Sequence, residues 1–234
     1  MLPITLDVAR LKVALVGRGD AVLRRLDALD AADARRLVVF SDAPSPALAA
    51  RAGDRLRRRL PAPGELAGCR LVVIAGLPEA LSETLAAQAS ASGALVNVED
   101  ATALCDVHMP AVVRRGALAV AISTGGRSPG LARLLKGVLE RLLDARWGAW
   151  LDELAAQRAR WRDAGLTMAA VSQRTAALVC ARGWLRGLLV PIEAFRDHSA
   201  VIASEAKQSR IVRWPSGLLR RSAPRNDEGL GDYS

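Results

Sequence analysis

Cysteine is scarce in this chain of 234 residues, and the three cysteines that occur are far apart. Cys69, Cys105 and Cys180 include no CxxC pair, which argues against a disulfide framework and a structural zinc site, so we expect no bound metal. No apolar run approaches the ~20 residues that span a bilayer. The N-terminal residues MLPITLDV lack the layout of a secretory signal peptide. We therefore expect a soluble cytoplasmic protein without a membrane partner.

Aromatic residues make up only 3% of the chain, and the net charge is +9. A positive charge of this size first suggests a nucleic-acid partner. The basic residues, however, are almost all arginine, lie scattered along the sequence, and form no aromatic-interleaved patch or basic helix. We interpret them as a solvated surface and expect no nucleic acid to bind. A polyanionic small molecule is the remaining alternative.

The first hundred residues alternate apolar, β-rich runs with helical patterns. Such alternation predicts an α/β fold with a parallel, doubly wound, Rossmann-like sheet. The run Leu71–Ala75 is apolar throughout, as expected for a strand buried on both faces. Leu56–Leu60 is a weaker, edge-like candidate because it contains three arginines. The other predicted strands are Lys12–Val16, Leu37–Phe40 and Leu95–Val98, and the predicted helices end near Asp30 and at Ser92.

A G-x-G motif follows the first predicted strand and opens the first helix, which is the context of a dinucleotide-binding fingerprint. Gly17 would permit a tight turn, and Gly19 would let the backbone approach a pyrophosphate at the helix N-terminus. Val22 replaces the third glycine of the fingerprint, so an ordinary strand–helix turn remains an alternative. The predicted cofactor-binding residues of this turn are Gly17, Arg18, Gly19, Asp20 and Ala21.

Asp42 follows the second predicted strand, about 20 residues beyond the glycines. An acid at this distance typically binds the ribose 2′-hydroxyl, and it would repel the 2′-phosphate of NADP. Asp42 and the neighbouring Ala43 therefore favour NAD as the cofactor. The alternative is a turn-forming aspartate before Pro44.

Residues 107–135 predict a strand, a tight turn, a second strand and a helix. Ala111–Arg114 and Leu118–Ile122 are short apolar runs that suit strands. Gly125-Gly126 tolerates positive φ angles after the second strand. Ser128 is a good N-cap, and Pro129 fits the first helical position.

The run PAVVRRGALAVAISTGGRSPGLARLL (residues 110–135) resembles the central signature of the siroheme synthase dehydrogenase family. The resemblance implies NAD-dependent oxidation of precorrin-2, a tetrapyrrole, to sirohydrochlorin by a homodimer. It leaves open whether the chain also acts as a ferrochelatase, with ferrous iron as a substrate. The implied domains are an NAD-binding Rossmann domain at 1–113, a dimerisation region at 114–150, a small helical domain at 151–198 and a poorly ordered tail at 199–234.

Asp100 ends an N-V-E-D segment after a predicted strand. Its residue type and position alone predict a turn or cap residue. The resemblance implies a different role, because the family's catalytic aspartate lies in an N-V-x-D segment, which here is Asn97–Asp100. Asp100 is therefore the candidate base for proton removal, and Asn97 is a candidate cofactor contact.

Cations near the glycine turn are candidate partners for the carboxylates of the implied substrate, because arginine binds carboxylates well. Each of them is equally well explained as a surface charge. We interpret His108 as a half-buried histidine rather than a metal ligand. The predicted substrate-binding residues are Arg114, Arg115, Ser123, Thr124, Gly125, Arg127 and Ser128, with Arg133 and Lys136 as further cations.

Two other classes of function stay open. The chain could be a non-catalytic NAD-binding module, or a basic nucleic-acid-binding protein. Binding of NAD⁺ without oxidation of precorrin-2 would indicate the first class. Salt-sensitive oligonucleotide binding without NAD⁺ affinity would indicate the second.

The sequence changes character after about His198, where it resembles a translated bacterial intergenic repeat. Mixed charge, proline and serine without sustained periodicity predict a poorly ordered appendage. Deleting residues 201–234 should therefore leave the melting temperature and the dehydrogenase activity nearly unchanged, which thermal unfolding and turnover assays would measure. A drop of several degrees would mean that this segment packs on the folded chain.

Overall fold

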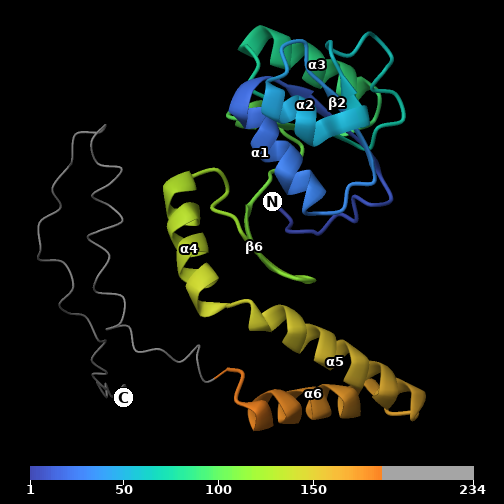
Figure 1. Ribbon diagram of the computed structural model, residues 1–234, viewed down its shortest axis with the longest axis vertical. Helices are drawn as coiled ribbons and strands as arrows, with labels where there is room; N and C mark the ends of the chain where they lie inside the picture. Colours follow the sequence, from blue (N-terminus) through green and yellow to red (C-terminus); the bar gives the residue numbers. More distant parts are fainter. Residues whose placement is uncertain (186–234) are drawn as a thin grey trace, which may run out of the picture. The chain divides into compact units, whose positions relative to one another are not determined.

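The structure is a computed structural model that describes residues 1–185 (Figure 1). The chain divides into two compact units, residues 1–172 and residues 173–234. Residues beyond Leu185, which include the predicted tail and the end of the predicted helical domain, lie outside the described residues. Within the described part of the chain, no helix is both long and apolar enough to cross a membrane.

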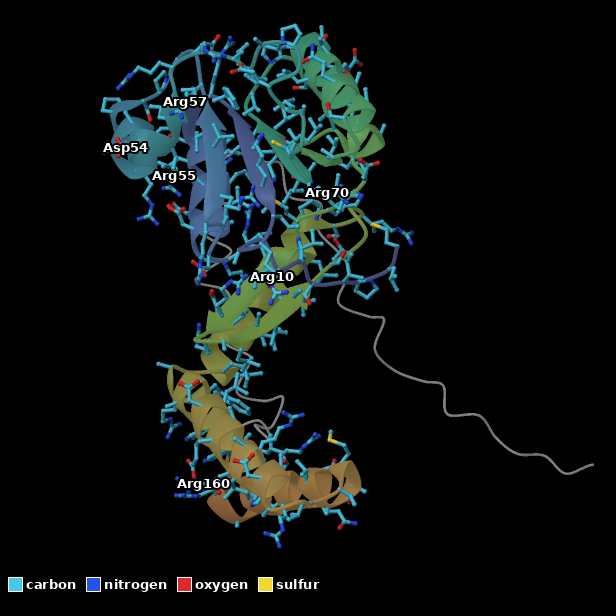
Figure 2. The ribbon with its side chains drawn as sticks, turned by 90° about the vertical axis from the view of Figure 1, so that its right-hand side faces the viewer. Arg10, Asp54, Arg55, Arg57, Arg70 and Arg160 are labelled. Atoms are coloured by element: carbon cyan, nitrogen blue, oxygen red, sulfur yellow. The ribbon has the colours of Figure 1, made fainter. Side chains whose placement is uncertain are left out.

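A five-stranded parallel sheet in the order β3-β2-β1-β4-β5 forms the core of the first unit. This arrangement confirms the predicted α/β fold. The predicted strand at 56–60 is wrong beyond Arg57, because β3 contains only two residues. Figure 2 shows Arg55 and Arg57 beside Asp54 at this edge, where charged side chains have to remain solvated. The strands are β1 (Lys12–Gly17), β2 (Arg36–Phe40), β3 (Leu56–Arg57), β4 (Leu71–Ala75) and β5 (Leu95–Val98).

Two apolar layers cover the two faces of the sheet. On one face, α1 and α2 bury side chains such as Leu26 and Leu48 against the strands. On the other face, α3 buries Leu85 and Ala89. Burial of one large aliphatic side chain contributes about 1.5–3 kcal/mol, so these layers hold the helices on the sheet. The helices are α1 (Gly19–Asp30), α2 (Pro46–Ala52) and α3 (Glu79–Ala91).

Helix α2 is absent from the sequence-based prediction, although its start carries a signal. The Ser45 hydroxyl oxygen accepts a hydrogen bond from the Leu48 N–H at 3.1 Å, and Pro46 occupies the first helical position. The helix has only seven residues, which is too short for an apolar periodicity to emerge. Its capping residues, rather than its pattern, could have revealed it.

After β5 the chain forms an antiparallel pair of strands and then α4, as predicted. Ser128 caps α4 by accepting a hydrogen bond from the Leu131 N–H at 3.3 Å. The expected boundary at 113/114 falls inside β6, and the division into four domains stays a prediction. The elements are β6 (Ala111–Arg115), β7 (Leu118–Ile122), α4 (Pro129–Leu142), α5 (Arg146–Asp163) and α6 (Met168–Arg182).

The side chain of Arg115 joins β6 to the end of α4. Its Nε donates to the Leu143 carbonyl at 2.5 Å, and its Nη2 donates to the Glu140 carbonyl at 2.8 Å. Glu140 lies in the last turn of α4 and Leu143 is its C-cap, and carbonyls at a helix end have no partner within the helix. Gly148 of α5 packs on the same strand, since a Cβ there would lie 3.1 Å from the Arg115 carbonyl oxygen. Arg115 therefore has a structural role in this part of the fold.

Helix α4 presents an apolar surface made of Leu131, Leu134 and Leu135, each at least 41% exposed. Ala132 is the buried residue of this helix. A two-stranded sheet such as β6–β7 is marginally stable by itself. This α4 surface is therefore a natural place for further packing.

Candidate active site

The strand order reverses between β1 and β4, which makes their carboxyl ends the switch point where α/β sheets bind ligands. At this point the two strand ends contact each other through their backbones. A Cβ on Gly17 would lie 1.9 Å from the Ala75 carbonyl oxygen, and a Cβ on Gly76 would lie 2.3 Å from the Arg18 carbonyl oxygen. Arg18 N–H also donates to the Ala75 carbonyl at 3.2 Å.

The two glycines of the G-x-G motif differ in backbone conformation and in surroundings. Gly17 has no positive φ, and its missing Cβ lets the chain turn close to Ala75; its predicted place in the cofactor site stays a prediction. Gly19 has a φ of 65°, and a Cβ there would project into open space. The first N–H groups of α1 have no side-chain cap, which suits a pyrophosphate at this helix N-terminus. Asp20 and Ala21 lie in that first turn and could contribute backbone N–H groups.

The structure brings Arg18 and Asp42, two predicted cofactor residues, into direct contact. The Arg18 guanidinium donates from Nε to Oδ1 at 2.6 Å and from Nη2 to Oδ2 at 2.5 Å. These hydrogen bonds lower the pKa of the Asp42 carboxyl below its usual value. The expectation that Asp42 would repel the 2′-phosphate of NADP assumed an unpaired negative charge. Arg18 compensates this charge. Ala43 follows Asp42 and is exposed.

A pocket opens beside the carboxyl end of β5. Its walls come from α1, from the loop after β5 with the short 3-10 helix η2 (Thr102–Leu104), and from the ends of β6, β7 and α4. Four predicted site residues line it: Asn97, Asp100, Ser123 and Thr124. Arg25, Glu99, Thr102, Cys105 and His108 also line it, and the sequence-based prediction gave none of them a role in binding or catalysis.

Asn97 is a buried residue of β5 and lines the pocket. Its Nδ2 donates to the Val107 carbonyl at 2.8 Å, which holds the returning loop against the strand. Its Oδ1 is buried and has no hydrogen-bond partner. A buried acceptor left unpaired costs about 1–3 kcal/mol, so a ligand N–H that reached Oδ1 would recover this energy. A carboxamide group, as in nicotinamide, has such a donor.

Asp100 follows β5 directly and has a φ of 60°, a conformation that aspartate tolerates better than most residues. The turn that the residue type predicts and the pocket position that the resemblance implies are thus both present. The side chain is exposed to the pocket mouth. Its neighbour Glu99 is half-buried and pairs with Arg24 and Arg25 of α1 at 3.5 and 3.4 Å. His108 is half-buried, which agrees with its interpretation from the sequence.

Several predicted substrate-binding residues do not line the pocket. The Arg115 guanidinium is engaged with the end of α4. Lys136 pairs with Glu140 at 3.7 Å on the surface of α4. The others that the structure does not bring to the pocket are Arg114, Gly125, Arg127, Ser128 and Arg133.

The comparisons with known proteins agree with this arrangement. Residues 4–111 match a family described as putative NAD(P)-binding, and residues 115–142 match the central region of sirohaem biosynthesis proteins. In these two regions the chain is similar to the siroheme synthase family. The two matched regions correspond to the sheet with its helices and to the strand pair with α4.

Curated relatives of this family include the siroheme synthase of Pseudomonas putida strain W619, 41% identical over 153 residues. The siroheme synthase of Pseudomonas entomophila strain L48 is 40% identical over 154 residues. These matches cover 64% and 65% of this chain but only 32% of each relative, so the chain spans about a third of their length. The solved structure of SirC, a precorrin-2 dehydrogenase, has the same fold, with a TM-score of 0.62 at 22% identity over 80% of this chain and 97% of SirC.

Gly19→Val should abolish NAD⁺ binding, because the added side chain fills the space where a pyrophosphate would approach the start of α1. Gly93→Val is the matched control, since Gly93 also has a positive φ, of 75°, and open space around it, but follows α3. Both variants should lose about 1–2 kcal/mol of stability through backbone strain. Titration calorimetry with NAD⁺ measures the difference. Equal affinities of the two variants for NAD⁺ would contradict the site.

Proposed function

We propose that this chain is an NAD⁺-dependent precorrin-2 dehydrogenase that forms sirohydrochlorin in siroheme biosynthesis. The observation that carries the proposal is the shared pocket of Asp100 and Asn97 at the carboxyl end of β5, on the same sheet edge as the Gly19 turn. The Gly19 turn suits a dinucleotide, and Asp100 would present its carboxylate to a substrate. The name of the structurally similar SirC supports the same reaction.

The oxidation removes a hydride and a proton from the tetrapyrrole. NAD⁺ supplies the hydride acceptor when it is bound. The start of α1 would hold the pyrophosphate, and Asn97 Oδ1 would accept a hydrogen bond from the carboxamide. Asp100 would take the proton from the substrate carbon, which requires an ionised carboxylate within hydrogen-bond reach. Asp42 keeps unused lone pairs beside Arg18 and would accept from the ribose hydroxyls.

Ferrochelatase activity is a second candidate function. Insertion of ferrous iron, as a substrate, releases two protons from the pyrrole nitrogens. Asp100 and His108 line the same pocket and could each accept one of them. Sirohydrochlorin supplied with ferrous iron under anaerobic conditions tests this activity separately from the oxidation.

Asp100→Asn should slow precorrin-2 oxidation by about 10²–10⁴-fold while NAD⁺ affinity stays unchanged, because it keeps the size of the side chain but removes the proton acceptor. Asp33→Asn is the matched control: Asp33 has the same φ of 60° but pairs with Arg35 away from the pocket. Anaerobic turnover assays compare the two variants. Near-full activity of Asp100→Asn would leave Asp100 as a turn residue only, and loss of iron insertion alone would assign it to the chelatase step.

The proposed enzyme is a cytoplasmic homodimer in which the α4 surface meets a second copy. Contact with a second copy would remove its three exposed leucines from water. It would also stabilise the small β6–β7 sheet. The free thiols of the three cysteines suit a reducing compartment.

Leu134→Glu should shift the protein from dimer to monomer, because it places a charge in the middle of the α4 surface. Met168→Glu is the control, since Met168 is 56% exposed and Leu134 is 57% exposed. Light scattering at micromolar concentration measures the mass of each variant. A wild-type protein that is already a monomer under these conditions would refute the dimer.

A further inference from the structure

The pocket beside Asp100 contains one arginine that the sequence did not point to. Precorrin-2 carries many carboxylates, and if the proposed function is right, at least one of them has to lie near the reacting carbon. We propose that Arg25 of α1 binds a substrate carboxylate in this pocket and positions the tetrapyrrole against Asp100.

The hydrogen-bonding capacity of Arg25 is largely unused. Its Nη2 approaches Glu99 Oε1 at 3.4 Å, at the long end of a hydrogen bond, and its Nε is buried without a partner. Of the five N–H donors of a guanidinium, the one on Nε is buried, so the donors available to a ligand are those of the two terminal nitrogens. The side chain is 23% exposed, which leaves the terminal nitrogens within reach of a ligand.

The position of Arg25 on α1 explains why it faces the pocket. Successive residues of an α-helix are about 100° apart around its axis. Val22, Leu26 and Leu29 form the buried stripe of α1, and Arg25 lies at the edge of that stripe. Arg24, about 100° away around the axis, is 66% exposed and does not line the pocket.

The charges of the pocket favour Arg25 as the anchor. Glu99 and Asp100 both line it, so a carboxylate that entered without a cation would be repelled. Arg25 is the only lysine or arginine among the lining residues, all of which belong to the described part of the chain. Glu99 also pairs with Arg24, so it keeps a partner when Arg25 turns to the substrate.

Arg25 would also set the distance between substrate and cofactor. It lies six residues beyond Gly19 on the same helix, which is about 9 Å along the axis at 1.5 Å per residue. One rigid helix would thus hold the pyrophosphate at its start and a substrate carboxylate less than two turns later. Such positioning on one element favours a reproducible alignment for hydride transfer.

The test compares Arg25→Met with Arg24→Met in the full-length protein. Arg25→Met should raise the KM for precorrin-2 at least about tenfold, because it removes a charge-assisted contact, with NAD⁺ affinity unchanged within about twofold. Arg24→Met, which also loses a pair to Glu99, should change KM by less than about threefold. Arg25→Lys should restore part of the affinity, since it keeps the charge but loses the bidentate geometry.

Four measurements separate the outcomes: the KM for precorrin-2, the affinity for NAD⁺, the melting temperature and the titration with sirohydrochlorin. Equal KM values for the two methionine variants would overturn the proposal, and so would a weaker NAD⁺ affinity in Arg25→Met, which would place Arg25 at the cofactor. If Arg25→Met does not fold, Arg25→Lys decides, and a KM equal to that of the wild type at an equal melting temperature overturns the proposal. If the wild type does not oxidise precorrin-2, the proposed function fails, and absorbance titration with sirohydrochlorin still measures whether Arg25 holds a tetrapyrrole.

Discussion

The contact between the ends of β1 and β4 is the constraint on which the rest of the site depends. Two backbones meet there at a distance that leaves no room for a Cβ on Gly17 or Gly76. This contact places the start of α1 directly above the switch point of the sheet. Because α1 is then held by its buried stripe against the strands, the Gly19 turn, Arg18 and Arg25 have fixed places relative to β5. The fold thus positions both halves of the candidate site through one helix.

Much of the fold could be predicted from the sequence because its signals are local. Parallel strands buried on both faces are continuous apolar runs, and Ser128 with Pro129 marks the start of α4 by capping chemistry alone. The missed helix α2 and the overlong strand predicted at 56–60 also have local causes. α2 is too short to show a period, and β3 ends at Arg57, before the rest of the arginine-rich run that was predicted as strand.

The site was only partly predictable, since its pocket is made by elements far apart in the sequence. Asn97 and Asp100 follow one strand, and their positions depend only on where β5 ends. Arg25 gave no signal, because whether a helical residue faces a pocket depends on how the helix packs. The cations near the glycine turn are close to a recognisable motif, but strand and helix directions take them elsewhere. Arg115 is the clearest case, because its donors complete the last turn of α4.

The shared pocket shows how the two matched regions depend on each other. The pocket takes one wall from the sheet domain and another from β6, β7 and α4, so it exists only while the second region is folded. That region has a two-stranded sheet and little buried surface of its own. Arg115 and Gly148 stabilise it from within the chain, and a second copy on the α4 surface would stabilise it from outside. In the proposed dimer, covering α4 would hold the wall that faces Asp100, so assembly and substrate binding would be linked.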